Sequence, residues 1–294
     1  MAEFEDFFYS AQDGLRLHAR IYGGMVAGAL PAICLAGLTR NARDFHELAI
    51  HLSKRARVRR TVVAFDYRGR GGSEWDKNWK NYDYIVEAND VMAGLAALGI
   101  GNGAFIGTSR GGLITLAIAA LRPALLRAVV LNDIGPVIEG AGLAQIRGYL
   151  ERAPRPRTLD EAVSILKAAQ GSAFPALSEA DWQRTALAMF KVTDGTFVAD
   201  YDPALIKTLT SMDFSRPLPI LWPQFEALYG VPLLAIRGEN SALMSAETLA
   251  EMERRHPDIR TVTVSGQGHA PFLETAGLPA KIAAFLERAD IRAS

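Results

Sequence analysis

Short apolar runs alternate with helix-like segments along this chain, and this alternation constrains the fold more than any other feature. Six runs have strand character, at residues 32–36, 61–65, 103–107, 128–131, 232–236 and 261–264. Between them, apolar residues recur at helical spacing over 42–55 and 84–98. Strands that are apolar along their whole length are buried on both faces, so the sequence predicts an α/β protein with a parallel sheet covered by helices.

A β-hairpin is predicted at the start of the chain. Strand-like residues 4–10 and 15–22 flank Gln12-Asp13-Gly14. Asp-Gly between two such runs favours a tight hairpin turn, because these two residues tolerate the backbone angles that the turn requires.

The alternation of strands and helices stops after Asp133, and strand character resumes only at Val231. The intervening residues carry helical segments that prolines interrupt. We predict that they form a helical insertion over the strand ends. The chain then divides into a first part of the core at 1–136, a helical cap at 137–216 and a second part of the core at 217–294.

The charge balance and the single cysteine exclude several classes of protein. Lys and Arg number 32, as do Asp and Glu, so the formal net charge is zero and nothing indicates a nucleic-acid or membrane partner. Cys34 stands in an apolar run and is expected to be buried, without a disulfide or a metal site. We expect no metal and no cofactor. Residues 1–6 lack a signal-peptide pattern, so a cytoplasmic protein is expected, of undetermined oligomeric state.

Gly107-Thr108-Ser109-Arg110-Gly111 is the most specific chemical motif in the sequence. It directly follows a strand-like run and directly precedes the apolar helical run 113–118. G-x-S-x-G in that setting is the pattern of a nucleophile elbow, a strained turn that exposes a serine hydroxyl. Side chains at 107 and 111 would clash in such a turn, and glycine removes them. We therefore predict that Ser109 is a nucleophile.

His269 is predicted to be the general base for that serine. It lies in the Gly-rich loop 265–271, directly after the strand-like run 261–264. From such a loop, a histidine can approach a nucleophile that another strand contributes. Structural roles are expected for the four histidines that lie on a strand, on a helix or near a helix end, which are His18, His46, His51 and His256.

These motifs resemble the α/β-hydrolase superfamily over the whole chain, and within it the cap-bearing bacterial esterase-like branch. Serine precedes histidine as in that superfamily, and residues 66–73 match its D-x-R-G-x-G-x-S loop. The resemblance implies an α/β-hydrolase fold, with a mostly parallel eight-stranded sheet and a helical cap insertion. Residues 36–40 occupy the place of the usual His-Gly loop, with Ala36 instead of His. The resemblance further implies that the backbone N–H groups of Leu38 and Arg110 form an oxyanion hole.

The carboxylate that a Ser-His pair needs is missing where the resemblance places it. In similar proteins the loop after the strand at 232–236 carries the acid at the position that Ala242 occupies here. The favoured interpretation is that Ala242 replaces a catalytic aspartate and leaves an impaired enzyme. A second interpretation takes the acid from Asp133, at the end of the preceding strand, as in some superfamily members. A third assigns the role to Glu239.

The leading functional hypothesis is a serine hydrolase that cleaves a small or medium carboxylic ester or lactone through an acyl-enzyme. The alternatives are a carbon–carbon bond hydrolase with the same triad and a non-catalytic, ligand-binding pseudoenzyme. The expected partner is a small-molecule substrate. Arg40 and Trp182 are candidate substrate-binding residues, and Arg40 with Arg110 would favour an anionic substrate.

Overall fold

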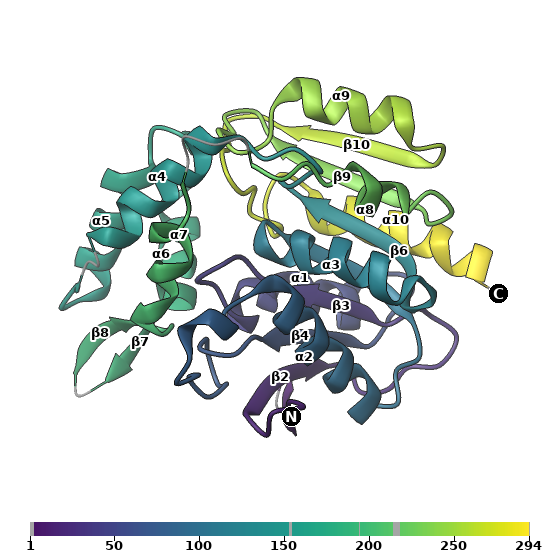
Figure 1. Ribbon diagram of the computed structural model, residues 1–294, viewed down its shortest axis with the longest axis horizontal. Coiled ribbons are helices and arrows are strands. Elements are labelled where there is room, and N and C mark those ends of the chain that lie inside the picture. Colours follow the sequence, from purple (N-terminus) through teal and green to yellow (C-terminus); the bar gives the residue numbers. More distant parts are fainter. Residues whose placement is uncertain (1–2, 153–154, 194, 214–217, 294) are drawn as a thin grey trace.

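The computed structural model describes residues 3–152, 155–193, 195–213 and 218–293, and its centre is an eight-stranded sheet. The strand order is β1-β2-β4-β3-β5-β6-β9-β10 (Figure 1). The six neighbouring strands β4, β3, β5, β6, β9 and β10 are parallel. The strands β1 and β2 form the predicted antiparallel hairpin, and β2 pairs antiparallel with β4. The strands are β1 (Glu5–Ser10), β2 (Arg16–Tyr22), β3 (Ala32–Leu35), β4 (Val62–Asp66), β5 (Gly103–Thr108), β6 (Leu126–Asn132), β9 (Leu233–Gly238) and β10 (Ile259–Val264).

Helices cover both faces of this sheet, which confirms the predicted fold class. One face packs against α2 (Tyr84–Ala97), α3 (Arg110–Leu121), α8 (Trp222–Glu226) and α9 (Ala246–Arg255). The other face packs against α1 (His46–Ile50) and α10 (Leu278–Ala293). Short turns of 3-10 or π helix complete the layers at η1 (Ala42–Phe45), η2 (His51–Arg55), η3 (Trp79–Asn81) and η4 (Pro123–Leu125).

The strand side chains divide between two apolar layers in the alternation that a strand imposes. In β3, Ile33 and Leu35 pack in the layer under α2 and α3, whereas Ala32 and Cys34 pack in the layer under α1 and α10. All four are completely buried, as expected for Cys34. Burial of each large aliphatic side chain stabilises the fold by roughly 1.5–3 kcal/mol. These two layers therefore hold the strands, and with them the strand ends, in place.

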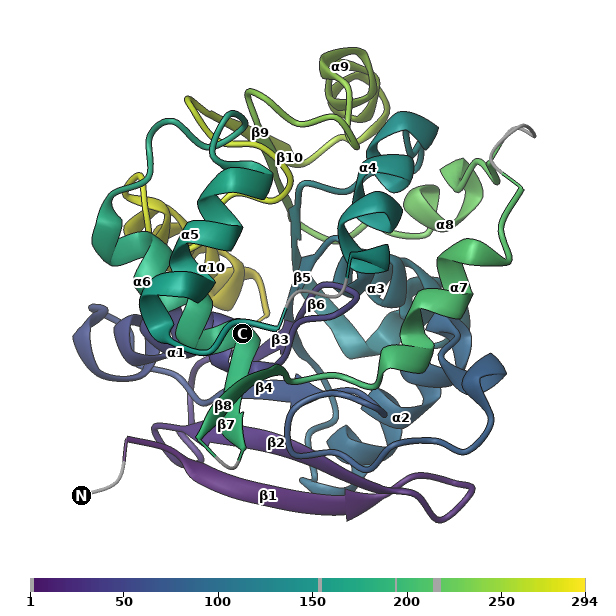
Figure 2. The same cartoon turned by 90° about the vertical axis from the view of Figure 1, so that its left-hand side faces the viewer.

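The elements from α4 to α7 lie beside the carboxyl ends of the parallel strands, and we call this group the insertion (Figure 1). In Figure 2, α5 and α6 lie to one side and α4 and α7 to the other, with β5 and β6 visible between them. The helices α5 and α6 share a small apolar core built around Leu166, Trp182 and Phe190. The elements of the insertion are α4 (Gly140–Glu151), α5 (Leu159–Gln170), α6 (Glu179–Met189), β7 (Phe190–Thr193), β8 (Thr196–Ala199), η5 (Pro203–Ile206) and α7 (Lys207–Thr210).

The expectation of a purely helical insertion is wrong at one place. The strands β7 and β8 pair antiparallel within it, so strand structure returns well before Val231. The sequence contains the signal for this hairpin, since Asp194-Gly195 is the same turn dipeptide that predicts the β1–β2 hairpin. Gly195 adopts the positive φ of 72° that such turns use.

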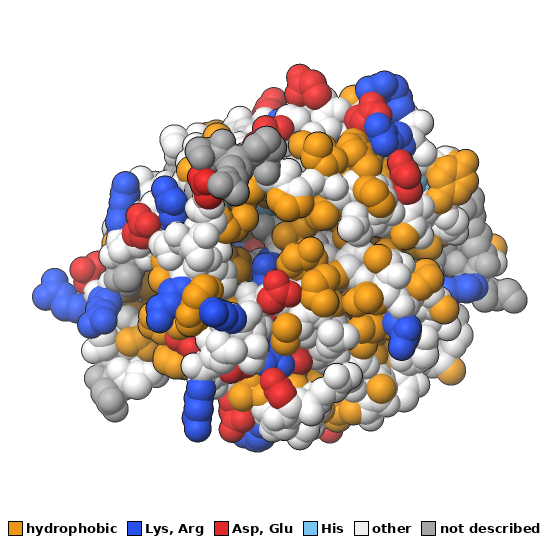
Figure 3. Space-filling view, viewed as in Figure 1, with side chains coloured by type: hydrophobic (Ala, Val, Ile, Leu, Met, Phe, Trp, Pro, Cys, Tyr) orange, Lys and Arg blue, Asp and Glu red, His pale blue; other side chains and the backbone are white. Residues whose placement is uncertain are grey.

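Charges of both signs are mixed over the face shown in Figure 3, including the insertion at its left, which agrees with a net charge of zero. Within the part of the chain that the structure describes, no helix combines the length and the apolar character needed to cross a bilayer.

The contact between α3 and β3 depends on a glycine, and this dependence is testable. A Cβ atom at Gly111 would overlap the backbone carbonyl of Leu35. We expect Gly111→Ala to lower the free energy of unfolding by about 1–3 kcal/mol, measured by urea denaturation. The control is Gly148→Ala in α4, where a Cβ meets open space and improved helix propensity should give a small gain. Equal stability of the two variants would contradict this packing.

Candidate active site

Ser109 lies in the sharp turn between the end of β5 and the start of α3, as the motif predicts. Its backbone adopts φ 51° and ψ −112°, a conformation that non-glycine residues rarely take. The turn is closed by the Ser109 N–H, which donates to the Asn132 carbonyl at 3.0 Å. A Cβ at Gly107 would lie 2.6 Å from the backbone of Gly111, so this turn needs glycine on both sides of the serine.

His269 reaches Ser109 from the loop after β10. Its Nε2 lies 2.8 Å from the Ser109 Oγ, and its Nδ1 lies 2.7 Å from the Asp133 Oδ2. The imidazole is largely buried and the Asp133 carboxyl is completely buried. An ionised carboxylate only accepts hydrogen bonds, so the proton of a neutral His269 belongs on Nδ1. Nε2 is then free to accept the hydroxyl proton of Ser109.

Asp133 is held by two further donors, one at the last position of β9 and one in the loop that follows it. The Gly238 N–H donates to its Oδ1 at 2.7 Å, and the Ser241 hydroxyl donates to its Oδ2 at 2.5 Å. These bonds satisfy the buried carboxylate and fix the oxygen that faces His269. Ser241 is not among the site residues predicted from the sequence, although a hydroxyl in the loop after β9 was a usable signal.

The other two positions considered for the acid do not bring a carboxylate to His269. Ala242 lines the neighbouring cavity with its methyl side chain. Glu239 is exposed and accepts hydrogen bonds from the Ser265 hydroxyl and the Gly266 N–H, and the latter bond is the main cause of a lowered pKa of Glu239. The end of β9 and the loop after it therefore supply donors to Asp133, whereas the Glu239 carboxylate binds Ser265 and Gly266 instead.

The two backbone N–H groups expected to form an oxyanion hole lie beside the serine. Leu38 follows β3 and Arg110 is the first residue of α3. Among the described residues, neither backbone N–H donates to a protein acceptor, so both remain free for a ligand oxygen. The side chain of Arg110 turns away to Glu87 and the Tyr82 carbonyl, at 2.7 and 2.9 Å, so an anionic substrate gains no direct support from it.

A cavity of about 570 Å³ adjoins Ser109 and His269. Its walls combine residues 37–40, which we call the oxyanion loop, and the loops after β9 and β10 with residues of α4, α5 and α6. Arg40 lines it and directs its guanidinium to Asp44 with two hydrogen bonds of 2.6 Å. Trp182 does not line the cavity. It packs behind Phe174 and Phe272, which do, so its contribution is to hold those two rings.

Comparison with known proteins agrees with this geometry. A family model described as alpha/beta hydrolase fold matches residues 31–276. The chain is 34% identical over 246 residues to a 3-hydroxybutyrate-oligomer hydrolase from Cupriavidus necator, covering 81% of this chain and 82% of that protein. It is 29% identical to a 2-(acetamidomethylene)succinate hydrolase from Mesorhizobium japonicum, covering 79% of each.

A solved structure extends the similarity to the whole chain. The crystal structure of an alpha/beta hydrolase from Novosphingobium aromaticivorans matches with a TM-score of 0.88 and 38% identity. The match covers 98% of this chain and 99% of that one. The protein therefore belongs to the alpha/beta hydrolase family and is an enzyme of the hydrolase class.

Proposed function

We propose that this enzyme is a serine hydrolase that cleaves a small or medium carboxylic ester or lactone through an acyl-enzyme. The observation that carries the proposal is the continuous series of hydrogen bonds from Ser109 through His269 to Asp133. A serine hydroxyl is a weak nucleophile until a base accepts its proton, and this series supplies the base and the group that orients it.

The reaction follows from the positions of the three side chains. Ser109 Oγ attacks the ester carbonyl while His269 Nε2 takes its proton, and the oxyanion accepts hydrogen bonds from the N–H groups of Leu38 and Arg110. Collapse of the tetrahedral intermediate breaks the ester C–O bond, and His269 protonates the leaving alkoxide. Water then gives a proton to His269, attacks the acyl carbon and releases the acid, and the proton returns to Ser109 Oγ.

Asp133 serves as the acid of the triad in this proposal. Its carboxylate contacts His269 Nδ1, is completely buried and accepts from Gly238 and Ser241. The protein then needs no carboxylate at position 242, and the interpretation of Ala242 as a lost aspartate becomes unnecessary. No observation favours the non-catalytic alternative.

We also propose that the insertion, residues 137–216 with its boundaries as predicted, is a cap that completes the substrate pocket. The support is that Gln145, Ile146 and Tyr149 of α4 and Met189 of α6 line the cavity that Ser109 and His269 line. A cavity of this size suits a short ester. The related 3-hydroxybutyrate-oligomer hydrolase makes short oligoesters of a hydroxy acid the first substrates to examine.

Replacing Asp133 tests the proposed triad. We expect Asp133→Asn to lower kcat for p-nitrophenyl acetate by on the order of ten-thousandfold, because His269 would lose the partner that orients it. Glu239→Gln should leave kcat unchanged. Ala242→Asp should not increase activity. An increase of orders of magnitude in Ala242→Asp would instead identify position 242 as the site of a missing acid.

Glu274 places a titratable carboxyl group in the lining of the proposed substrate pocket. It lines the cavity together with Arg40, Asp44 and Arg184. Burial raises the pKa of Glu274 to about 7, the charge of Asp44 adds to the rise, and the bond to its own backbone and the two arginines oppose it. The Glu274 carboxyl is therefore mostly neutral below pH 7 and becomes negatively charged above it.

The raised pKa of Glu274 predicts a pH-dependent cost in stability. Between its ordinary value of 4.5 and about 7, the unfolded chain has lost a proton that the folded protein retains, so stability falls as the pH rises through this window. The Tm of Glu274→Gln relative to the wild type should therefore be higher at pH 8 than at pH 5, by about a few degrees.

The matched control is Glu239→Gln. Because the pKa of Glu239 is lowered, its contribution to stability is lost only below the ordinary value of 4.5, and the Tm difference from the wild type should be the same at pH 5 and pH 8. If the Tm difference between Glu274→Gln and the wild type is the same at pH 5 and pH 8, the raised pKa of Glu274 is refuted.

A further inference from the structure

Glu87 is a completely buried carboxylate on α2 that binds two arginines at once. Its Oε1 accepts from Arg70 Nη1 and its Oε2 accepts from Arg110 Nε, each at 2.7 Å. Burial alone would raise the pKa of Glu87, but Arg110 and Arg70 outweigh that effect and lower it, so the group is ionised. A buried ion pair is weak evidence for a purely stabilising role, because removing the charges from water offsets much of their attraction.

Arg70 connects Glu87 to the oxyanion loop. Arg70 Nε donates to the Leu38 carbonyl at 2.8 Å, and Arg70 Nη1 also donates to the Arg68 carbonyl at 2.6 Å. The Nη2 atom of Arg70 has no hydrogen-bond partner among the described residues, while the guanidinium lies 5.5 Å from the ring centres of Tyr67 and Tyr82. The guanidinium is therefore held on several sides. By fixing the carbonyl of Leu38, it restricts the rotation of the backbone that carries the Leu38 N–H.

Arg110 connects Glu87 to the nucleophile elbow. Arg110 directly follows Ser109, and its side chain is held by Glu87 and by the Tyr82 carbonyl. Its own backbone N–H is the second proposed oxyanion donor. The two donors belong to different segments, one after β3 and one after β5, and Glu87 joins the arginines that contact both segments.

We propose that Glu87 is a positioning residue that fixes the distance between the two halves of the oxyanion hole. The inference rests on the proposed function, since it needs an oxyanion at that place. Two donors stabilise a tetrahedral oxyanion only when both lie about 2.7–3.1 Å from it. A displacement of about 1 Å costs on the order of a hundredfold in rate, and the ground-state ester is affected far less. Glu87 therefore acts on kcat through Arg70 and Arg110 without touching substrate.

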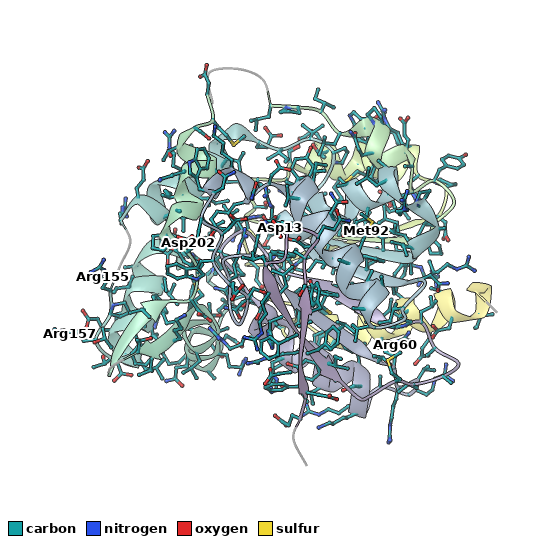
Figure 4. The ribbon with its side chains drawn as sticks, turned by 60° about the horizontal axis from the view of Figure 1, so that its bottom comes forward. Asp13, Arg60, Met92, Arg155, Arg157 and Asp202 are labelled. Atoms are coloured by element: carbon teal, nitrogen blue, oxygen red, sulfur yellow. The ribbon has the colours of Figure 1, made fainter. Side chains whose placement is uncertain are left out.

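Asp90 offers a matched control on the same helix. It lies three residues after Glu87, is almost completely buried and binds Arg68 with two hydrogen bonds of 2.7 Å. Arg68 also contacts Asp76 and Asp13, and Asp13 is labelled in Figure 4. None of these three carboxylates contacts the oxyanion loop or the elbow within the described ranges. Asp90→Asn thus removes a comparable buried ion pair, while Asp76 and Asp13 still hold Arg68, whose carbonyl accepts from Arg70.

The test compares Glu87→Gln with Asp90→Asn in three measurements. They are thermal unfolding, kcat and KM for p-nitrophenyl acetate, and the inhibition constant of a trifluoromethyl ketone, which forms an oxyanion on the serine. Both variants should lose stability. Glu87→Gln should lower kcat by roughly 10- to 100-fold with little change in KM, and weaken the ketone by a similar factor. Asp90→Asn should leave kcat and the ketone affinity close to those of the wild type.

A second variant keeps the test decisive if Glu87→Gln does not fold. Arg70→Met leaves Glu87 paired with Arg110 but releases the Leu38 carbonyl, and it should also lower kcat and ketone affinity together. Wild-type values of both quantities in a folded Glu87→Gln or Arg70→Met variant would overturn the inference. So would an equal loss in Asp90→Asn. If the wild type itself neither hydrolyses the ester nor binds the ketone, the proposed function fails and the inference falls with it.

Discussion

The rest of the site depends on the buried charge of Asp133. A carboxylate without exposure to water must be satisfied by donors, and here these are the Gly238 N–H, the Ser241 hydroxyl and the ring of His269. Asp133 follows β6, and its partners lie at the end of β9 or in the loops after β9 and β10, so one charge links three neighbouring strand ends. The interactions that orient His269 are thus also those that close this edge of the sheet.

Ser109 lies between two buried charge clusters that affect different parts of its proposed chemistry. On one side, Asp133 orients the histidine that faces the hydroxyl. On the other, Glu87 and its two arginines hold the segments that carry the free N–H groups of Leu38 and Arg110. The strained backbone of Ser109 exposes its hydroxyl between them, and the tightly packed start of α3 maintains that strain.

The sheet, the elbow and the histidine loop could be predicted because their signals are local: an apolar run, a pair of glycines, a loop after a strand. The acid could not be chosen, because β6 and β9 are neighbours and a carboxylate at the end of either strand can reach the same histidine. Only the fold shows that a carboxylate reaches His269 from Asp133. Glu87 was not identified either, since a single glutamate on a helix gives no sequence signal of its two partners.

The most direct test of the account is to trap the covalent intermediate. The enzyme is mixed with p-nitrophenyl butyrate, quenched in acid during the first turnover and digested, and the peptides are weighed by mass spectrometry. We expect a butyryl group on Ser109 in the wild type, formed far more slowly in Asp133→Asn. Ester hydrolysis without acylation of Ser109, or equally fast acylation in both proteins, would contradict it.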